Sequence, residues 1–123
     1  MRNNEQLLFD VNDPRGYRVV LSKSQYENHI ISSDGHQAHN EFTPTEIKAC
    51  IESPEIIYQS SSVQSRDLYF GRKSASYPGM YIKTVVEMDE QEKSGEVVTA
   101  HLTKKLNGGK DDGLRYVSAK FEL

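Results

Sequence analysis

The chain contains cationic, hydroxyl and imidazole side chains that could bind a phosphate and move a proton. They are Arg66, Lys83, Lys104 and Lys105, the threonines Thr99 and Thr103, and the histidines His29 and His101. Cations neutralise a phosphate, hydroxyls donate hydrogen bonds to it, and imidazole exchanges a proton near neutral pH. A metal-independent ribonuclease needs these groups, because attack by the RNA 2′-hydroxyl requires a base, an acid and cations around the transition state.

The stretch 80–105 would position most of these side chains. It consists of two alternating runs joined by a polar loop, which predicts a β-hairpin. Strand side chains alternate between faces, so Ile82, Val86 and Leu102 share an apolar face that we expect to be core. The opposite face is either simply hydrated, as in many antiparallel sheets, or the floor of a cleft. It carries Lys83, Thr99 and His101.

The N-terminal part of the chain predicts a second hairpin and then a helix. Residues 6–11 and 17–21 are β-prone, and DPRG at 13–16 has the residue types of a type I turn. SKSQ at 22–25 is a capping box. A helix is expected to follow it, with His29 beside its buried stripe.

TPTE at 43–46 predicts the start of a second helix, because it combines an N-cap threonine, a first-turn proline and a glutamate at the third helical position. Pro54 would end this helix. Residues 55–60, 66–72 and 114–123 are expected to be strands. The order predicts an α+β fold, in which a small antiparallel sheet of four or more strands carries both helices on one face.

Composition limits the classes of function. A chain of 123 residues suits one domain, which we expect to span 1–123. No apolar run could cross a membrane and the N-terminus lacks a secretory signal, so we expect no membrane partner. A single cysteine, Cys50, fits a cytoplasmic protein. The net charge of −3 does not attract a polyanion, so a nucleic-acid site would have to be a local basic patch.

Other possible sites have simpler interpretations. His29, His36 and His39 could ligate zinc, but no cysteine joins them, and polar loop histidines explain them more simply. Cys50 falls on the buried stripe of the second helix, where a small hydrophobic residue is expected. No glycine-rich stretch has the spacing of a nucleotide-binding loop. We therefore expect no metal and no other cofactor.

The order of several segments resembles a known nuclease superfamily. HII, TEIKACIESPEIIYQS, RDLYF, YIKTVVEM and GEVVTAHLTKK follow one another along the chain. This order is similar to the phage-associated branch of the barnase/EndoU/colicin/RelE-like (BECR) nucleases, over about residues 25–105. The resemblance implies a toxin-type or phage-type ribonuclease. Its partners would be RNA, such as tRNA or ribosome-associated RNA, and a cognate immunity or antitoxin protein.

The resemblance also implies roles for individual residues. His29 would be the general base or acid. Arg66 and Lys83 would hold the scissile phosphate, and Thr99 would donate a hydrogen bond to it. Where the family pattern has an aromatic residue this chain has His101, which would be a second proton carrier or an outward polar substitution. Tyr69 and Thr103 would be substrate-binding residues. Lys104 is expected to join them because it is a cation that can neutralise a phosphate.

Structural alternatives to these roles stay open. His29 could be half-buried beside Tyr26, and Tyr69 could pack across to Tyr81. In a regular strand Arg66 would share a face with the apolar residues two and four positions after it. To reach a polar face it would have to precede the regular strand or sit at a bulge.

Two other classes of function also fit the sequence. A non-catalytic module could hold RNA or a protein on the same sheet face, and it predicts salt-sensitive RNA binding without cleavage. An interaction protein, such as an immunity partner, would direct the acidic loop 89–96 at a basic toxin.

Overall fold

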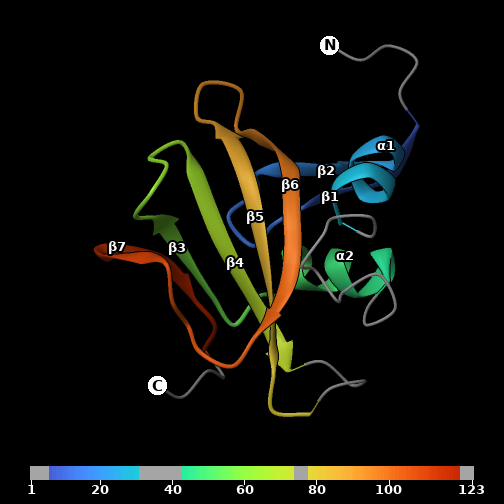
Figure 1. The fold of residues 1–123 in the computed structure, drawn as a ribbon. Helices are drawn as coiled ribbons and strands as arrows, with labels where there is room; N and C mark the ends of the chain where they lie inside the picture. The colour runs from blue at the N-terminus through green and yellow to red at the C-terminus, as the bar shows by residue number, and fades with distance from the viewer. Residues whose placement is uncertain (1–5, 31–42, 74–77, 120–123) are drawn as a thin grey trace.

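A computed structural model describes residues 6–30, 43–73 and 78–119, without the side chains of His29 and Lys73. Within these ranges a seven-stranded sheet has the order β1-β2-β6-β5-β4-β3-β7 (Figure 1). Its strands are β1 (Leu7–Asn12), β2 (Arg18–Ser22), β3 (Ile56–Ser60), β4 (Arg66–Lys73), β5 (Tyr81–Asp89), β6 (Ser94–Thr103) and β7 (Gly109–Val117). Neighbouring strands are antiparallel except β2 and β6, which run parallel.

Helical structure is short. α1 (Lys23–Gln25) is a single turn that continues as the π-helical segment η1 (Tyr26–Ile30). α2 (Pro44–Glu52) begins with the expected capping box between Thr43 and Glu46. In the described part of the chain, no helix is long and apolar enough to cross a membrane.

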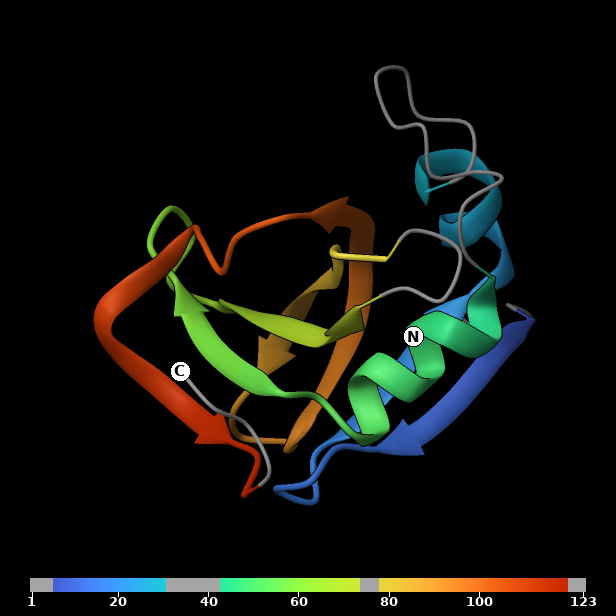
Figure 2. The same cartoon turned by 90° about the horizontal axis from the view of Figure 1, so that it is seen from below.

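The main core lies between α2 and the sheet. α2 contacts β1 on one side and β4 and β5 on the other, as Figure 2 shows. Its stripe of Ile47, Cys50 and Ile51 is buried there, and full burial of one isoleucine contributes about 1.5–3 kcal/mol. Burial also raises the pKa of Cys50 to about 12. The thiol therefore stays protonated and acts as a small hydrophobic side chain.

A smaller apolar cluster lies on the opposite face of the sheet, around Leu68 and Phe70. The connection from β6 to β7 crosses this face, because β7 pairs with β3 on the far side of β5 and β4 (Figure 2). Both the amide and the hydroxyl of Ser61 donate to the carbonyl of Gly108, at 3.0 and 2.9 Å. These bonds attach the connection to the turn between β3 and β4.

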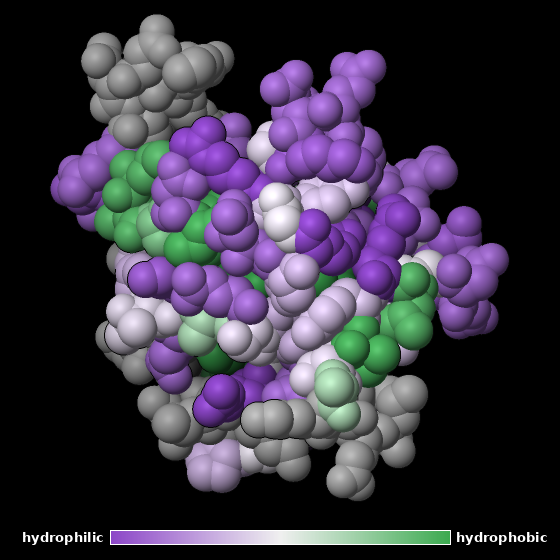
Figure 3. Space-filling model, turned by 180° about the vertical axis from the view of Figure 1, so that it is seen from behind, coloured by the Kyte–Doolittle hydropathy of each residue, from purple (hydrophilic) through white to green (hydrophobic). Residues whose placement is uncertain are grey.

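The surface is mainly hydrophilic when seen from behind, with separate hydrophobic patches (Figure 3). The most exposed large apolar side chains of the described ranges belong partly to the edge strands. They are Leu7 on β1, Leu114 and Val117 on β7, and Val63 between β3 and β4. Singly exposed apolar residues are normal for a folded chain.

The expected fold is wrong in its main feature. In the described ranges the structure is not a small antiparallel sheet carrying two helices, but one mixed seven-stranded sheet with one short helix and a helical turn. The N-terminal hairpin joins the sheet through the parallel pairing of β2 with β6, and β7 joins it through β3. Such pairings between distant segments leave no trace in local periodicity. The last strand also begins earlier than expected, at Gly109.

Candidate functional site

β5 and β6 place Lys83, Thr99 and His101 together on the sheet face opposite α2. Lys83 is directly opposite His101, and Val85 is directly opposite Thr99, so the Cβ atoms of each pair are about 5 Å apart. We call these four residues, with Leu68 and Phe70 beside them on β4, the Lys83 face. The prediction that the polar members share a face is therefore confirmed.

Lys83 is half-buried beneath the β6–β7 connection. Its Nζ atom lies 3.5 Å from Oδ1 of Asn107 and 5.8 Å from the ring centroid of Phe70. Among the described residues it forms no ion pair with a carboxylate. Burial lowers the pKa of Lys83, because the charged ammonium loses water. The side chain is thus a cation suited to an anionic ligand.

The connection approaches Lys83 most closely at Gly108. This glycine has a left-handed φ of +86°, and a Cβ built there would lie 2.8 Å from Nζ of Lys83. Both the backbone conformation and the close approach therefore favour glycine.

Polar atoms of Thr99 and His101 are also covered. Oγ1 of Thr99 is buried and has no hydrogen-bond partner among the described residues. Nδ1 of His101 is buried as well, and His101 has an interaction partner. An unsatisfied buried hydroxyl costs roughly 1–3 kcal/mol, and such groups are rare in folded proteins. The Lys83 face is therefore not optimised for stability alone.

Arg66 lies on the same face but farther along the strands. It is the first residue of β4 and pairs regularly with Glu87, so it neither precedes the strand nor sits at a bulge, the two positions expected for it. This pairing puts it about 13 Å along β5 from Lys83. Its Nε donates to Oε1 of Glu87 at 2.8 Å. Hydrogen bonds from Ser65 and Arg66 lower the pKa of Glu87. Arg66 is therefore already paired and is not brought together with Lys83.

Two of the remaining predicted residues, Thr103 and Lys104, lie at the end of β6. Oγ1 of Thr103 donates to the carbonyl of Lys105 at 2.9 Å, and Lys104 is exposed just beyond the strand. His29 belongs to η1, which contacts β6. Its side chain is outside the described part of the structure, as are His36 and His39. A pairing of His29 with Lys83 stays a prediction.

Tyr69 faces the other way, into a charged network that the sequence did not indicate. Its hydroxyl donates to Oδ2 of Asp13 at 2.6 Å. Nη2 of Arg15 donates to Asp13 at 2.9 Å, to Asp67 at 3.1 Å and to the Tyr69 hydroxyl at 3.0 Å. Nε of Arg115 lies 3.4 Å from Oδ1 of Asp67. We call these five residues the charged network.

The carboxylates and the tyrosine of the charged network are deeply buried, whereas Arg115 closes it at the surface. The side chains of Asp13 and Asp67 are 0% and 2% exposed. Burial raises the pKa of Asp67 although both arginines oppose the shift, and burial together with Asp13 raises the pKa of Tyr69. Burial alone would lower the pKa of Arg15, but Tyr69 and Asp13 raise it. The network joins the β1–β2 turn to β4 and β7, so its evident role is structural.

Within the described ranges, no group of three or more His, Cys, Asp or Glu side chains is placed to hold a metal ion. The resemblance to BECR nucleases stays a prediction, carried by the residues quoted for it. No family model matches the chain, and no curated protein or solved structure matches it.

Proposed function

We propose that the protein is a metal-independent endoribonuclease centred on Lys83 and His101. One observation carries the proposal: a half-buried lysine without a carboxylate partner among the described residues lies directly across from a histidine. A phosphodiester would supply the negative charge that this lysine lacks, and the imidazole could exchange a proton with the attacking hydroxyl.

In the proposed reaction the 2′-oxygen bonds to phosphorus while the bond from phosphorus to the 5′-oxygen breaks. Nε2 of His101 takes the proton of the 2′-hydroxyl, since Nδ1 is buried. The ammonium of Lys83 stabilises the phosphorane and donates a proton to the leaving 5′-oxygen, which its lowered pKa favours. The products are a 2′,3′-cyclic phosphate and a 5′-hydroxyl, and solvent restores both side chains.

Two of the residues named from the sequence have no role at this centre. Arg66 is paired with Glu87 farther along the sheet, and Tyr69 is committed to the charged network. Thr99 would act only if its covered hydroxyl became accessible to a phosphate oxygen. We place the reaction in the cytoplasm, because the single cysteine is free and buried.

The test is cleavage of tRNA and total RNA by purified protein, with EDTA and without it. We expect cleavage under both conditions, with 2′,3′-cyclic phosphate ends, and no cleavage of an analogue that lacks the 2′-hydroxyl. Lys83→Met and His101→Gln should each lower the rate about 10²-fold or more. Lys110→Met is the matched control, because it removes an exposed lysine on β7.

RNA left intact by the wild-type protein would exclude the enzyme. If the same RNA bound with a salt-sensitive affinity that Lys83→Met weakened, the Lys83 face would instead serve a non-catalytic binding module. Equal cleavage by wild type and both variants would point to a contaminating nuclease.

A further inference from the structure

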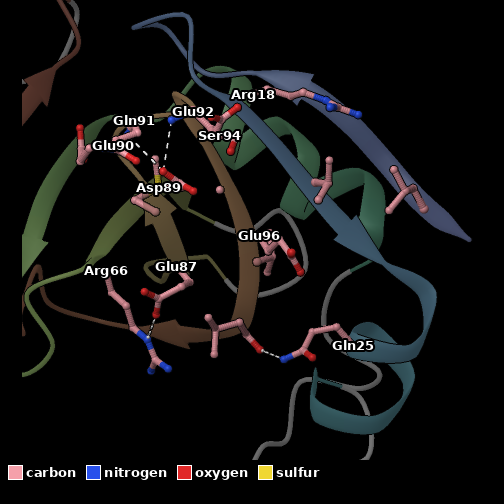
Figure 4. Close-up of a pocket in the computed structure, with 16 residues that line it drawn as sticks. Arg18, Gln25, Arg66, Glu87, Asp89, Glu90, Gln91, Glu92, Ser94 and Glu96 are labelled. Carbon is pink, nitrogen blue, oxygen red and sulfur yellow. Dashed lines mark hydrogen bonds and ion pairs between the residues drawn. The ribbon is translucent and has the colours of Figure 1, made fainter. Parts of the chain in front are cut away.

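The other end of the same sheet face contains a broad hollow beside the β5–β6 hairpin (Figure 4). Its volume is about 1150 Å³, somewhat above the range of about 300–1,000 Å³ that is usual for small-ligand pockets. Glu87 and Glu96, directly opposite each other on β5 and β6, line it. The hollow is therefore distinct from the Lys83–His101 pair, which does not line it.

The floor of the hollow is aliphatic. Leu7 of β1, which is 39% exposed, Val20 of β2 and Val98 of β6 all line it and are at least partly exposed. Val98 has no partner residue on β5, because the register between β5 and β6 shifts at this point. Its carbonyl accepts a hydrogen bond from Nε2 of Gln25 at 2.5 Å. The floor thus offers apolar area that α2, on the opposite face, cannot cover.

The rim of the hollow is acidic. Five acidic residues line it, Glu87, Asp89, Glu90, Glu92 and Glu96, compared with two basic ones, Arg18 and Arg66 (Figure 4). Both arginines are already engaged, Arg66 with Glu87 and Arg18 with Asp10 outside the hollow. The rim therefore keeps an excess of negative charge around an apolar floor.

We propose that this hollow docks a basic segment of a partner protein, in which lysine or arginine residues alternate with apolar ones. The apolar side chains would cover Leu7, Val20 and Val98, and the cations would meet the rim at Glu92 and its neighbours. Charge complementarity of this kind selects the partner and speeds association. A nucleic acid or an anionic membrane surface would be repelled by the same rim. The proposal is independent of the ribonuclease assignment.

The experiment measures binding of a fluorescein-labelled octapeptide of alternating lysine and leucine, by anisotropy in about 150 mM salt. Octalysine is the comparison probe. Glu92→Gln combined with Val20→Thr removes one rim charge and one floor contact, whereas Asp89 is left in place because it accepts amide hydrogen bonds from Gln91 and Glu92. Asp111→Asn with Leu114→Thr is the matched control, since it likewise replaces one carboxylate by an amide and one aliphatic side chain by threonine, at exposed positions of β7.

We expect the hollow variant to weaken binding of the alternating peptide about tenfold and the control variant to change it by less than about twofold. Octalysine should bind more weakly than the alternating peptide. Amide chemical-shift changes should be confined to β1, β2, the β5–β6 hairpin and the lining residues Gln25 and Arg66. The proposal is overturned if neither peptide binds, if both variants lose affinity equally, if octalysine binds as tightly, or if RNA added without peptide shifts the amides of the hollow.

Discussion

The charged network and the Lys83 face both contain charged side chains beside aromatic ones, but they differ in how the charges are paired. In the charged network, Arg15 holds two carboxylates and a tyrosine hydroxyl within 3.1 Å. On the Lys83 face, the nearest described polar partner of the lysine is an asparagine oxygen at 3.5 Å. Buried charge is tolerated only when it is paired and hydrogen-bonded. The charged network therefore uses paired charges to hold strands together, whereas the Lys83 face has a cation that is available to a ligand.

The largest effect on stability is expected for Asp13→Ala, which removes the central acceptor of the charged network. Asp13 accepts hydrogen bonds from the amides of Arg15 and Tyr17 at 2.8 and 3.0 Å, besides those from the Arg15 side chain and Tyr69. Its removal leaves a buried arginine and buried donors without an acceptor, so we expect a loss of about 3–5 kcal/mol in the free energy of unfolding. Urea denaturation followed by circular dichroism measures it.

Asp111→Ala is the control for that substitution, because Asp111 is exposed on β7 and should change stability by no more than about 0.5 kcal/mol. Similar unfolding free energies for the two variants would mean that the charged network does not hold the fold.

A smaller effect is expected for Tyr69→Phe. The change deletes only the hydroxyl that lies 2.6 Å from Asp13 and 3.0 Å from Arg15. We expect about 1–2 kcal/mol of destabilisation, with RNA cleavage per folded molecule unchanged. Tyr58→Phe, at a tyrosine of the smaller apolar cluster, controls for loss of a hydroxyl elsewhere. If Tyr69→Phe abolished cleavage without loss of stability, Tyr69 would be a substrate-binding residue after all.

The smallest effect on stability is expected for Lys83→Met. This substitution should stabilise the protein, whereas the two substitutions above destabilise it. Burial holds the folded pKa of Lys83 below its ordinary value of 10.5, so the charged form opposes folding at neutral pH. The variant should be more stable by less than about 1 kcal/mol, because the side chain keeps contact with water. As pH rises through the folded pKa towards 10.5, the wild-type lysine loses its charge and the difference should shrink. Urea unfolding of both proteins at several pH values measures this difference in stability. A difference that widens as pH rises would contradict this account.

The parts of the fold that the sequence predicted correctly depend on local patterns. Period-two alternation predicted the β5–β6 hairpin and put Lys83, Thr99 and His101 on one face. A capping box with a first-turn proline predicted α2. A helix was also expected after SKSQ, but only its first turn formed as α1 before the chain passed into η1.

What the sequence could not predict depends on contacts between distant segments. Strict alternation would place Val97 on the same face as Thr99, but the register shift beside Val98 turns the side chain of Val97 into the main core. Asp13 and Arg15 matched a turn and gave no sign of their partners on β4, more than fifty positions away along the chain. A turn signature describes the local backbone and not the residues that later pack against it.

The parallel pairing of β2 with β6 also fixes an order of events during synthesis. β2 leaves the ribosome well before its partner residues Ser94–Glu96, because α1, η1, α2, β3, β4 and β5 lie between β2 and β6 in the chain. Until then Val19 and Leu21, both fully buried in the finished fold, have only part of their final surroundings. A chain interrupted before β6 would therefore expose a strand edge and an incomplete core, the features that recruit chaperones and promote aggregation.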